Sequence, residues 1–236
     1  MKRFLTGMGL ICVLFVAAPA AAEHLELGIA AGPTFMHDES YEAFSSDTMT
    51  LGTYGLDIRS ELGSVKGVEF VLFVGYRFGM NQGTIDHMLD TELYSHDFRL
   101  GLRVRKDLIS WLGIFVEAHG GVLLGFMNAS LSGAWNGNTT LGTQDTYEDM
   151  AATWTAGGRL GVETHFSRPW LASHNIKRFC FGGEISVGYD AHGDLDFDPT
   201  LSGGGDNAID TETLGSWGGL NPSGITLQIA GSFYFF

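Results

Sequence analysis

Hydrophobic residues alternate with small, polar or charged residues along eight separate segments of this chain. In residues 68–78, Val68, Phe70 and Leu72 share one face, while Glu69 and Arg77 lie on the other. A period of two residues indicates a β-strand, whose successive side chains point to opposite faces. The eight segments span residues 24–36, 51–62, 68–78, 93–105, 112–127, 154–166, 178–189 and 224–236. The pattern therefore predicts an all-β fold.

The lengths of the segments and of their connections favour a membrane barrel over a soluble β-sandwich, which gives the same alternation. The segments run 11 to 16 residues, whereas a tilted membrane strand needs about 9–11 and soluble strands are usually about 5–6. Short connections (63–67, 106–111, 167–177) alternate with long ones (37–50, 79–92, 128–153, 190–223). We therefore predict an eight-stranded antiparallel up-and-down transmembrane β-barrel with short periplasmic turns and long extracellular loops.

Aromatic residues cluster at the two ends of these segments, as expected for two membrane interfaces. At the long-loop ends lie Phe35, Tyr54, Tyr76, Phe78, Tyr94, Phe126, Trp154 and Tyr189. At the short-turn ends lie Trp111, Phe166, Trp170, Phe179 and Phe235.

The C-terminal residues 232–236 resemble the assembly signal of outer-membrane barrels, in which apolar residues precede a final Phe at alternate positions. Phe236 and Tyr234 match this signal, whereas Ser232 and Gln228 do not, and a small bulge would reconcile the two patterns. The mature chain as a whole resembles the small OmpA/OmpX-like outer-membrane barrels. The resemblance implies their fold, the barrel assembly machinery as a partner and contact with outer-membrane lipid, but it leaves the function open.

The N-terminus has the pattern of an export signal. Lys2 and Arg3 precede an apolar run over residues 4–16, and three alanines end at Ala22. We expect residues 1–22 to be a signal peptide cleaved near Ala22, and residues 23–236 to form one barrel domain in the outer membrane of a Gram-negative bacterium. The alternative, an uncleaved anchor, needs about 20 apolar residues. The mature chain then keeps one cysteine, Cys180, so it has no intramolecular disulfide.

Charged residues occupy the face of the segments that would point into the barrel. The acids on this face are Glu26, Asp57, Glu61, Glu69, Asp97, Glu117, Glu163 and Glu184. The arginines are Arg59, Arg77, Arg99, Arg103, Arg105 and Arg159. Eight strands enclose a space that side chains just fill, and buried charges must be paired. We predict a plugged interior with an ion-pair network centred on Arg99, Arg103 and Arg159 with Glu117, Glu163 and Glu184, beside inward Phe73, Phe115 and Leu123.

Catalytic patterns are weak in this sequence. His165 and Ser167 superficially resemble the His-x-Ser of barrel lipid A deacylases, but the position of that family's orienting Glu holds Phe179 here. Glu117 and His119 would suit acid–base chemistry, although a hydrogen-bonded core explains them equally well. Cys180 is expected to be a packed thiol. We therefore expect no enzymatic activity and no cofactor.

The four long connections carry seventeen acidic residues and no lysine or arginine. These acids are Asp38, Glu39, Glu42, Asp47, Asp86, Asp90, Glu92, Asp145, Glu148, Asp149, Asp190, Asp194, Asp196, Asp198, Asp206, Asp210 and Glu212. Such a field attracts cationic or Ca²⁺-bridged surface partners and argues against nucleic-acid binding. Asp194, Asp196 and Asp198 are spaced to offer carboxylates to Ca²⁺, but the run lacks the glycine and closing Glu of an EF-hand loop.

The leading hypothesis is a non-enzymatic outer-membrane barrel with a structural or surface-interaction role carried by its acidic extracellular loops. One alternative is a narrow, porin-like channel for ions or small solutes. Another is a lipid-modifying enzyme that uses His119 or His165. The sequence identifies no ligand, surface partner or oligomeric state, and the strand count rises by two if the last long connection contains a hairpin.

Overall fold

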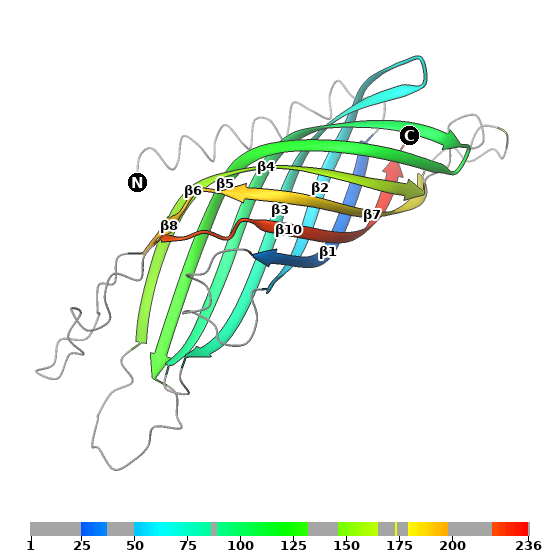
Figure 1. Cartoon of the computed structure of the whole chain (residues 1–236). Helices are drawn as coiled ribbons and strands as arrows, with labels where there is room; N and C mark the ends of the chain where they lie inside the picture. The colour runs from blue at the N-terminus through cyan, green and yellow to red at the C-terminus, as the bar shows by residue number, and fades with distance from the viewer. Residues whose placement is uncertain are drawn as a thin grey trace, which may run out of the picture.

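The computed structural model describes residues 25–36, 50–85, 89–131, 146–164, 173, 179–197 and 219–235. Eight long strands form a closed antiparallel barrel (Figure 1). They are β1 (Leu25–Met36), β2 (Thr50–Val65), β3 (Val68–Ile85), β4 (Leu89–Ile109), β5 (Leu112–Leu131), β6 (Thr146–Thr164), β7 (Phe179–His192) and β10 (Gly224–Phe235). Each strand pairs with the next one along the barrel, and β1 pairs with β10 to close the ring. The predicted eight-stranded up-and-down barrel is confirmed.

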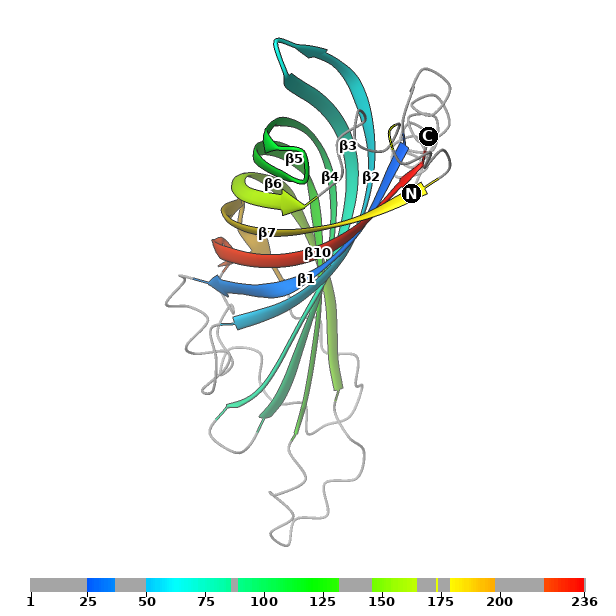
Figure 2. The same cartoon turned by 90° about the vertical axis from the view of Figure 1, so that its right-hand side faces the viewer.

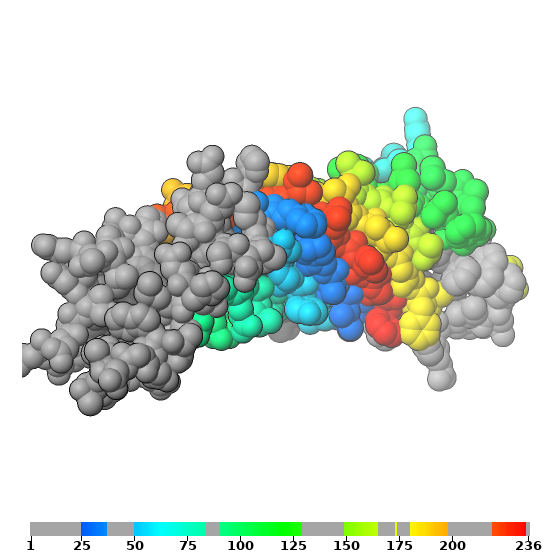
Figure 3. Space-filling view, turned by 60° about the horizontal axis from the view of Figure 1, so that its bottom comes forward, coloured from blue at the N-terminus to red at the C-terminus, as the bar shows by residue number. Residues whose placement is uncertain are grey.

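The outer wall of the barrel is apolar and its interior is charged. Figure 3 shows β1 and β10 side by side in this wall. Outward side chains such as Ile29, Val116 and Ile229 are 54%, 62% and 67% exposed, while the inward Arg59 and Glu117 are buried. This is the inverse of a soluble protein and the arrangement of an outer-membrane β-barrel, whose apolar band faces lipid. A helix long and apolar enough to cross a bilayer is not found among the described residues.

One end of the barrel, here called the turn end, carries tight hairpins. Only Lys66 and Gly67 separate β2 from β3, and both have positive φ, of 53° and 76°. Two positive φ values in a two-residue loop give a turn whose twist matches that of the paired strands. Only residues 110–111 separate β4 from β5. The predicted short connections 63–67 and 106–111 are therefore two-residue turns, each next to a register shift in the pairing.

At the opposite, loop end, β3, β4, β5 and β6 extend beyond the rest of the barrel (Figure 2). The pairing of β2 with β3 ends at Met80, and that of β6 with β7 begins at Thr155. Residues 81–85, 89–93, 127–131 and 146–149 still pair with one another and form what we call the outer sheet. The prediction that residues 79–92 form a long loop is wrong. Beyond the hydrocarbon the outward face of a strand meets water, so its outward residues need not be apolar.

A small hairpin closes the loop end from inside. Strands β8 (Leu195–Asp196) and β9 (Gly219–Leu220) form a separate two-stranded sheet, so the last long connection does contain a hairpin while the barrel keeps eight strands. Their side chains join an apolar group that we call the mouth cluster. It consists of Met36, Leu51, Leu93, Leu123, Met127, Ala151, Leu195, Phe197 and Leu220. Residues on five barrel strands thus pack against this hairpin segment.

Inward glycines leave room for the long arginine side chains, and Gly55 offers a test. A Cβ built on Gly55 would overlap the Arg77 side chain, whereas a Cβ on Gly231 meets nothing within 4 Å. Gly55→Val is therefore expected to displace Arg77 from Asp57 and to lower the free energy of unfolding by about 1–3 kcal/mol or more. Denaturant unfolding in lipid vesicles measures this, with Gly231→Val as the control. Equal effects of the two changes would contradict the expectation.

Candidate functional site

Arg59 is the centre of the ion pairs nearest the turn end. Its Nη1 donates to Glu26 Oε1 at 2.5 Å, and its Nη2 donates to Asp57 Oδ2 at 3.0 Å and to Glu184 Oε1 at 2.9 Å. The Arg59 side chain has no exposed surface. Strands β2 and β7 are separated by β1 and β10 in one direction, so the contact between Arg59 and Glu184 crosses the interior of the barrel.

Arg103 reaches the same glutamate from the opposite wall. Its Nη1 lies 2.6 Å from Glu184 Oε2, and its Nη2 lies 2.7 Å from Glu117 Oε2. Glu163 Oε2 lies 3.3 Å from Nη1, and the guanidinium carbon lies 3.9 Å from the centroid of the Phe115 ring. Glu184 on β7 is therefore shared by arginines of β2 and β4. We call Glu26, Arg59, Arg103, Glu117, Glu163 and Glu184 the turn-side network.

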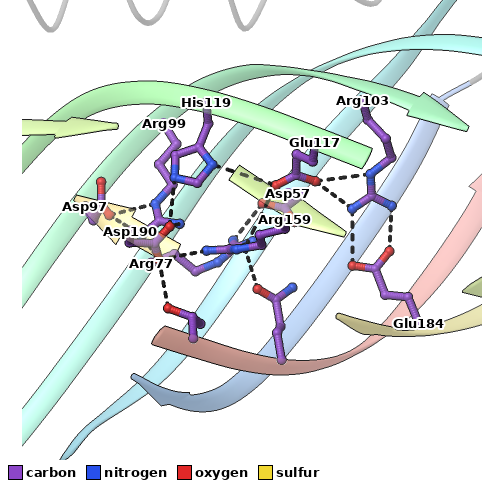
Figure 4. A network of polar contacts seen from close by, with 12 residues as sticks. Asp57, Arg77, Asp97, Arg99, Arg103, Glu117, His119, Arg159, Glu184 and Asp190 are labelled. Carbon is purple, nitrogen blue, oxygen red and sulfur yellow. Dashed lines mark hydrogen bonds and ion pairs between the residues drawn. The ribbon is translucent and has the colours of Figure 1, made fainter. Parts of the chain in front are cut away.

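Asp190 joins four side chains nearer the loop end. Its Oδ2 accepts from Arg99 Nη2 and Arg159 Nη2, each at 3.1 Å, and from Thr226 Oγ1 at 3.0 Å. His119 Nε2 lies 3.0 Å from Asp190 Oδ1. Figure 4 shows Arg99, Arg159 and His119 converging on Asp190. These residues and Asp97, which pairs with Arg99, form what we call the loop-side network.

Asp57 connects the turn-side network to a further arginine. It accepts from Arg77 Nη1 at 2.6 Å and Nη2 at 2.8 Å, a two-pronged contact, while also accepting from Arg59. Such fork-to-fork pairs fix geometry as well as charge. Arg159 in turn donates to Gln228 Oε1 on β10 at 2.5 Å. Polar contacts therefore tie together strands on every side of the interior.

The six residues predicted to centre the network are all buried, but they fall into two groups. Arg103 contacts Glu117, Glu163 and Glu184 together. Arg159 comes within 3.9 Å of Glu117. Arg99 contacts Asp97 and Asp190, not the three predicted glutamates.

The assignment of Asp190 to an acidic extracellular loop is wrong. This residue lies within β7, is only 2% exposed and is the centre of the loop-side network. The alternation along β7 already places even-numbered residues inward, from Cys180 through Glu184 and Ser186. Extending that parity by two residues past Gly188 would have identified Asp190. The apolar half of the pattern ends at Tyr189, which is why the strand was ended too early.

Of the two residues of the predicted assembly signal, Tyr234 and Phe236, the structure describes one. Tyr234 is buried inside the barrel, and β10 pairs with both neighbours without a register shift, so the expected bulge does not occur along Gly224–Phe235. Tyr234 therefore has the position that the assembly signal requires, two residues before the C-terminal residue, but its side chain faces the interior. Phe236, the other residue of the predicted assembly signal, lies outside the described residues.

The metal candidates do not come together among the described residues, whereas the acid–base candidates do: His119 Nδ1 lies 4.0 Å from Glu117 Oε1, inside the charged networks. Asp194 Oδ1 accepts from Asn221 Nδ2 at 2.9 Å, Asp196 lies in β8, and Asp198 lies outside the described residues. Within the described ranges, no three His, Cys, Asp or Glu residues are grouped to hold a metal ion. His165 and Ser167 lie outside those ranges, as do residues 1–22. Cys180 is a buried free thiol.

The arrangement as a whole fills the barrel instead of lining a passage. Arginines and carboxylates from opposite walls meet at hydrogen-bonding distance at two levels, and the mouth cluster lies at the loop end. Phe73, Phe115 and Leu123 are buried among them. A charged side chain buried in this way is stable only with such partners. The arginines and carboxylates of the interior therefore neutralise one another's charges.

Comparison with known proteins gives distant structural likeness only. No protein-family model and no curated protein sequence matches this chain. Neisserial surface protein A superposes with a TM-score of 0.43 at 14% identity, over 90% of this chain and 97% of that one. The attachment invasion locus protein Ail of Yersinia pestis gives 0.45 at 11% identity, over 91% and 99%. The N-terminal barrel domain of Pseudomonas aeruginosa OprF gives 0.32 at 13% identity, over 91% and 98%.

Proposed function

We propose that this protein is a closed outer-membrane barrel that holds an acidic surface outside the cell and binds cationic partners there, directly or through bridging Ca²⁺. It acts neither as a channel nor as an enzyme. The observation that carries the proposal is the filled interior. Arg59 and Arg103 reach Glu184 from two different walls, and the mouth cluster lies at the loop end. The barrel therefore serves as an anchor for its outer parts.

The distribution of charge supports the outer surface as the working part. After residue 22 the chain has eleven lysines and arginines. Six are the interior arginines, and the other five are Lys66, Lys106, Arg168, Lys177 and Arg178, which belong to the turn-end connections and their flanking residues. Outward positions of the outer sheet carry Asp90 and Glu92 instead. Residues 37–49, 86–88, 132–145 and 198–218 add ten acids without a lysine or arginine. Such a field draws in positive partners.

Conductance distinguishes the anchor from the channel. The refolded mature protein is expected to be silent in a planar bilayer, and Arg99→Ala is expected to stay silent, because the turn-side network still crosses the interior without Arg99. Single-channel recording measures this. Steady, cation-selective openings of the wild type that change in Arg99→Ala would overturn the proposal and favour the narrow channel.

Charge neutralisation tests the surface role. A fluorescent oligolysine peptide is expected to bind vesicles that contain the protein. Binding should weaken severalfold between low salt and about 0.15 M salt, because exposed charges are screened. Changing Asp38, Glu39, Glu42 and Asp47 to their amides is expected to reduce binding, whereas changing Glu61 and Glu69 near the turn end leaves it unchanged. Undiminished binding after the first change, in the presence and absence of Ca²⁺, would count against these acids as the binding surface.

A further inference from the structure

A group of aromatic side chains with a histidine among them covers the lipid-facing side of β3, β4 and β5. We call it the aromatic patch; it consists of Tyr76, Phe78, Tyr94, His96, Phe98 and Phe126. Tyr76 lies 5.3 Å from Phe98 between ring centroids, and Phe78 lies 6.2 Å from Tyr94 in a stacked arrangement. Strand pairing places these residues in neighbouring rows, so the patch is continuous across three strands.

His96 gives this patch a fixed polar group. Its Nδ1 lies 2.7 Å from the hydroxyl of Tyr76, and its ring lies 5.4 Å from Phe78 and 5.3 Å from Phe126. The aromatic neighbours and the Tyr76 hydroxyl thus hold the imidazole in one place. Within the described residues Nε2 of His96 makes no hydrogen bond, so it is the ring nitrogen that an outside group can use. A ring held in this way is prepared for a ligand before the ligand arrives.

The patch lies where the lipid-facing surface changes from apolar to polar. Toward the turn end the outward residues of β4 are Leu100, Leu102 and Val104, all exposed. Toward the loop end Gln82 and Glu92 face each other, with Gln82 Nε2 3.2 Å from Glu92 Oε1. Tyr94 donates its hydroxyl to Glu92 Oε2 at 2.8 Å, which connects the rings to this polar pair. Amphipathic rings at this height mark the level of lipid headgroups.

We propose that the aromatic patch, together with Gln82 and Glu92, binds the sugar headgroup of a glycolipid in the outer leaflet. The acyl chains lie along Leu100 and Leu102, and the apolar faces of the sugar rings pack against the aromatic side chains. The sugar hydroxyls bond to the Glu92 carboxylate, the Gln82 amide and His96. Aromatic rings offer flat apolar area, and the hydroxyl of a tyrosine beside them adds a polar group that can bond a sugar hydroxyl.

Charge selects the sugar over the phosphate of a phospholipid. Outside the barrel interior, the described residues include two lysines and no arginine, and both lysines, Lys66 and Lys106, lie at the turn end. Glu92 beside the patch repels an anionic headgroup. At the loop end, the exposed rings of Phe35, Trp154 and Tyr189 make no ring-to-ring contact within the described residues, and the one other pair on the wall, Phe181 with Phe233 at 5.0 Å, lies toward the turn end. The patch is therefore more than one section of an even aromatic belt.

Lipid titration tests this proposal. The protein folded in a zwitterionic detergent is titrated with a neutral diglycosyl diacylglycerol, with phosphatidylglycerol and with phosphatidylcholine of the same acyl chains. Binding is followed by calorimetry. We expect the neutral glycolipid to bind best. Phe78→Ala and Glu92→Ala are expected to weaken its binding by about five- to tenfold, and Phe35→Ala, a matched loss of one exposed ring on β1, to leave it unchanged.

A second variant separates the polar role of His96 from its packing. His96→Phe keeps an aromatic ring beside Phe78 and Phe126 but removes the nitrogen, and retained folding is checked by heat-dependent electrophoretic mobility. Weaker glycolipid binding by this folded variant supports the proposal. The proposal is overturned if phosphatidylglycerol binds as tightly as the glycolipid, if Phe35→Ala weakens binding as much as Phe78→Ala, or if none of the patch variants changes the titration.

Discussion

Arg103→Met is expected to lower the free energy of unfolding by about 3–5 kcal/mol, because it leaves buried carboxylates without their counter-charge. Methionine fills a similar space beside Phe115 but pairs with none of Glu117, Glu163 and Glu184. Reversible denaturant unfolding in lipid vesicles, followed by tryptophan fluorescence, measures the loss.

The control for this change is Lys106→Met, on the outward face of the same strand, which is expected to change stability by less than about 1 kcal/mol. A second change identifies the cause. Glu184→Gln added to Arg103→Met removes one of the carboxylates that Arg103 neutralised, which lowers the excess negative charge of the turn-side network, so part of the lost stability should return. If Glu184→Gln destabilises the Arg103→Met variant as much as it destabilises the wild type, charge imbalance is not the reason for the loss.

Asp190→Asn is expected to destabilise the barrel by about 3 kcal/mol, the second of the large effects. Asparagine is nearly the same size but leaves Arg99 and Arg159 facing each other without the shared carboxylate. Denaturant unfolding measures this as well, and the melting temperature in detergent should fall with it.

Asp194→Asn, four residues further along the chain, is the matched control. Asp194 is exposed and bonds only to Asn221 among the described contacts, so its neutralisation is expected to cost about 0–1 kcal/mol. If both variants lose the same stability, the loop-side network does not depend on Asp190. A loss from Asp194→Asn alone would place the important acid outside the barrel.

The alternation of residues predicts the fold of this chain well because a membrane barrel is built on that alternation. The strand predicted over residues 68–78 is correct, because the outward face of this segment is apolar. The prediction ends too early at Phe78, because the next outward polar residue of the strand, Gln82, lies where lipid no longer demands apolar side chains. The same limit hid Asp190, whose strand continues three residues beyond Tyr189.

Pairing inside the barrel is less predictable than the barrel itself. Parity identifies Arg99, Arg103 and Arg159 as inward, but not which acid each one meets. That choice depends on the register between strands and on contacts across the interior, such as Arg99 with Asp190, 91 residues apart. The mouth cluster could not be predicted from the sequence either, because Leu195 and Leu220 belong to two-residue strands, which are too short to show a period.

The glutamate shared by two walls also has a consequence for the order of folding. Glu184 lies 125 residues from Arg59 and 81 from Arg103, so all three meet only after β7 has joined the sheet. Before that point Arg59 and Arg103 have only their partners on the early strands, Glu26, Asp57 and Glu117, and incompletely paired charges oppose entry into the bilayer. We therefore expect deep insertion to wait until the ring is nearly complete, with a half-made barrel held at the membrane surface.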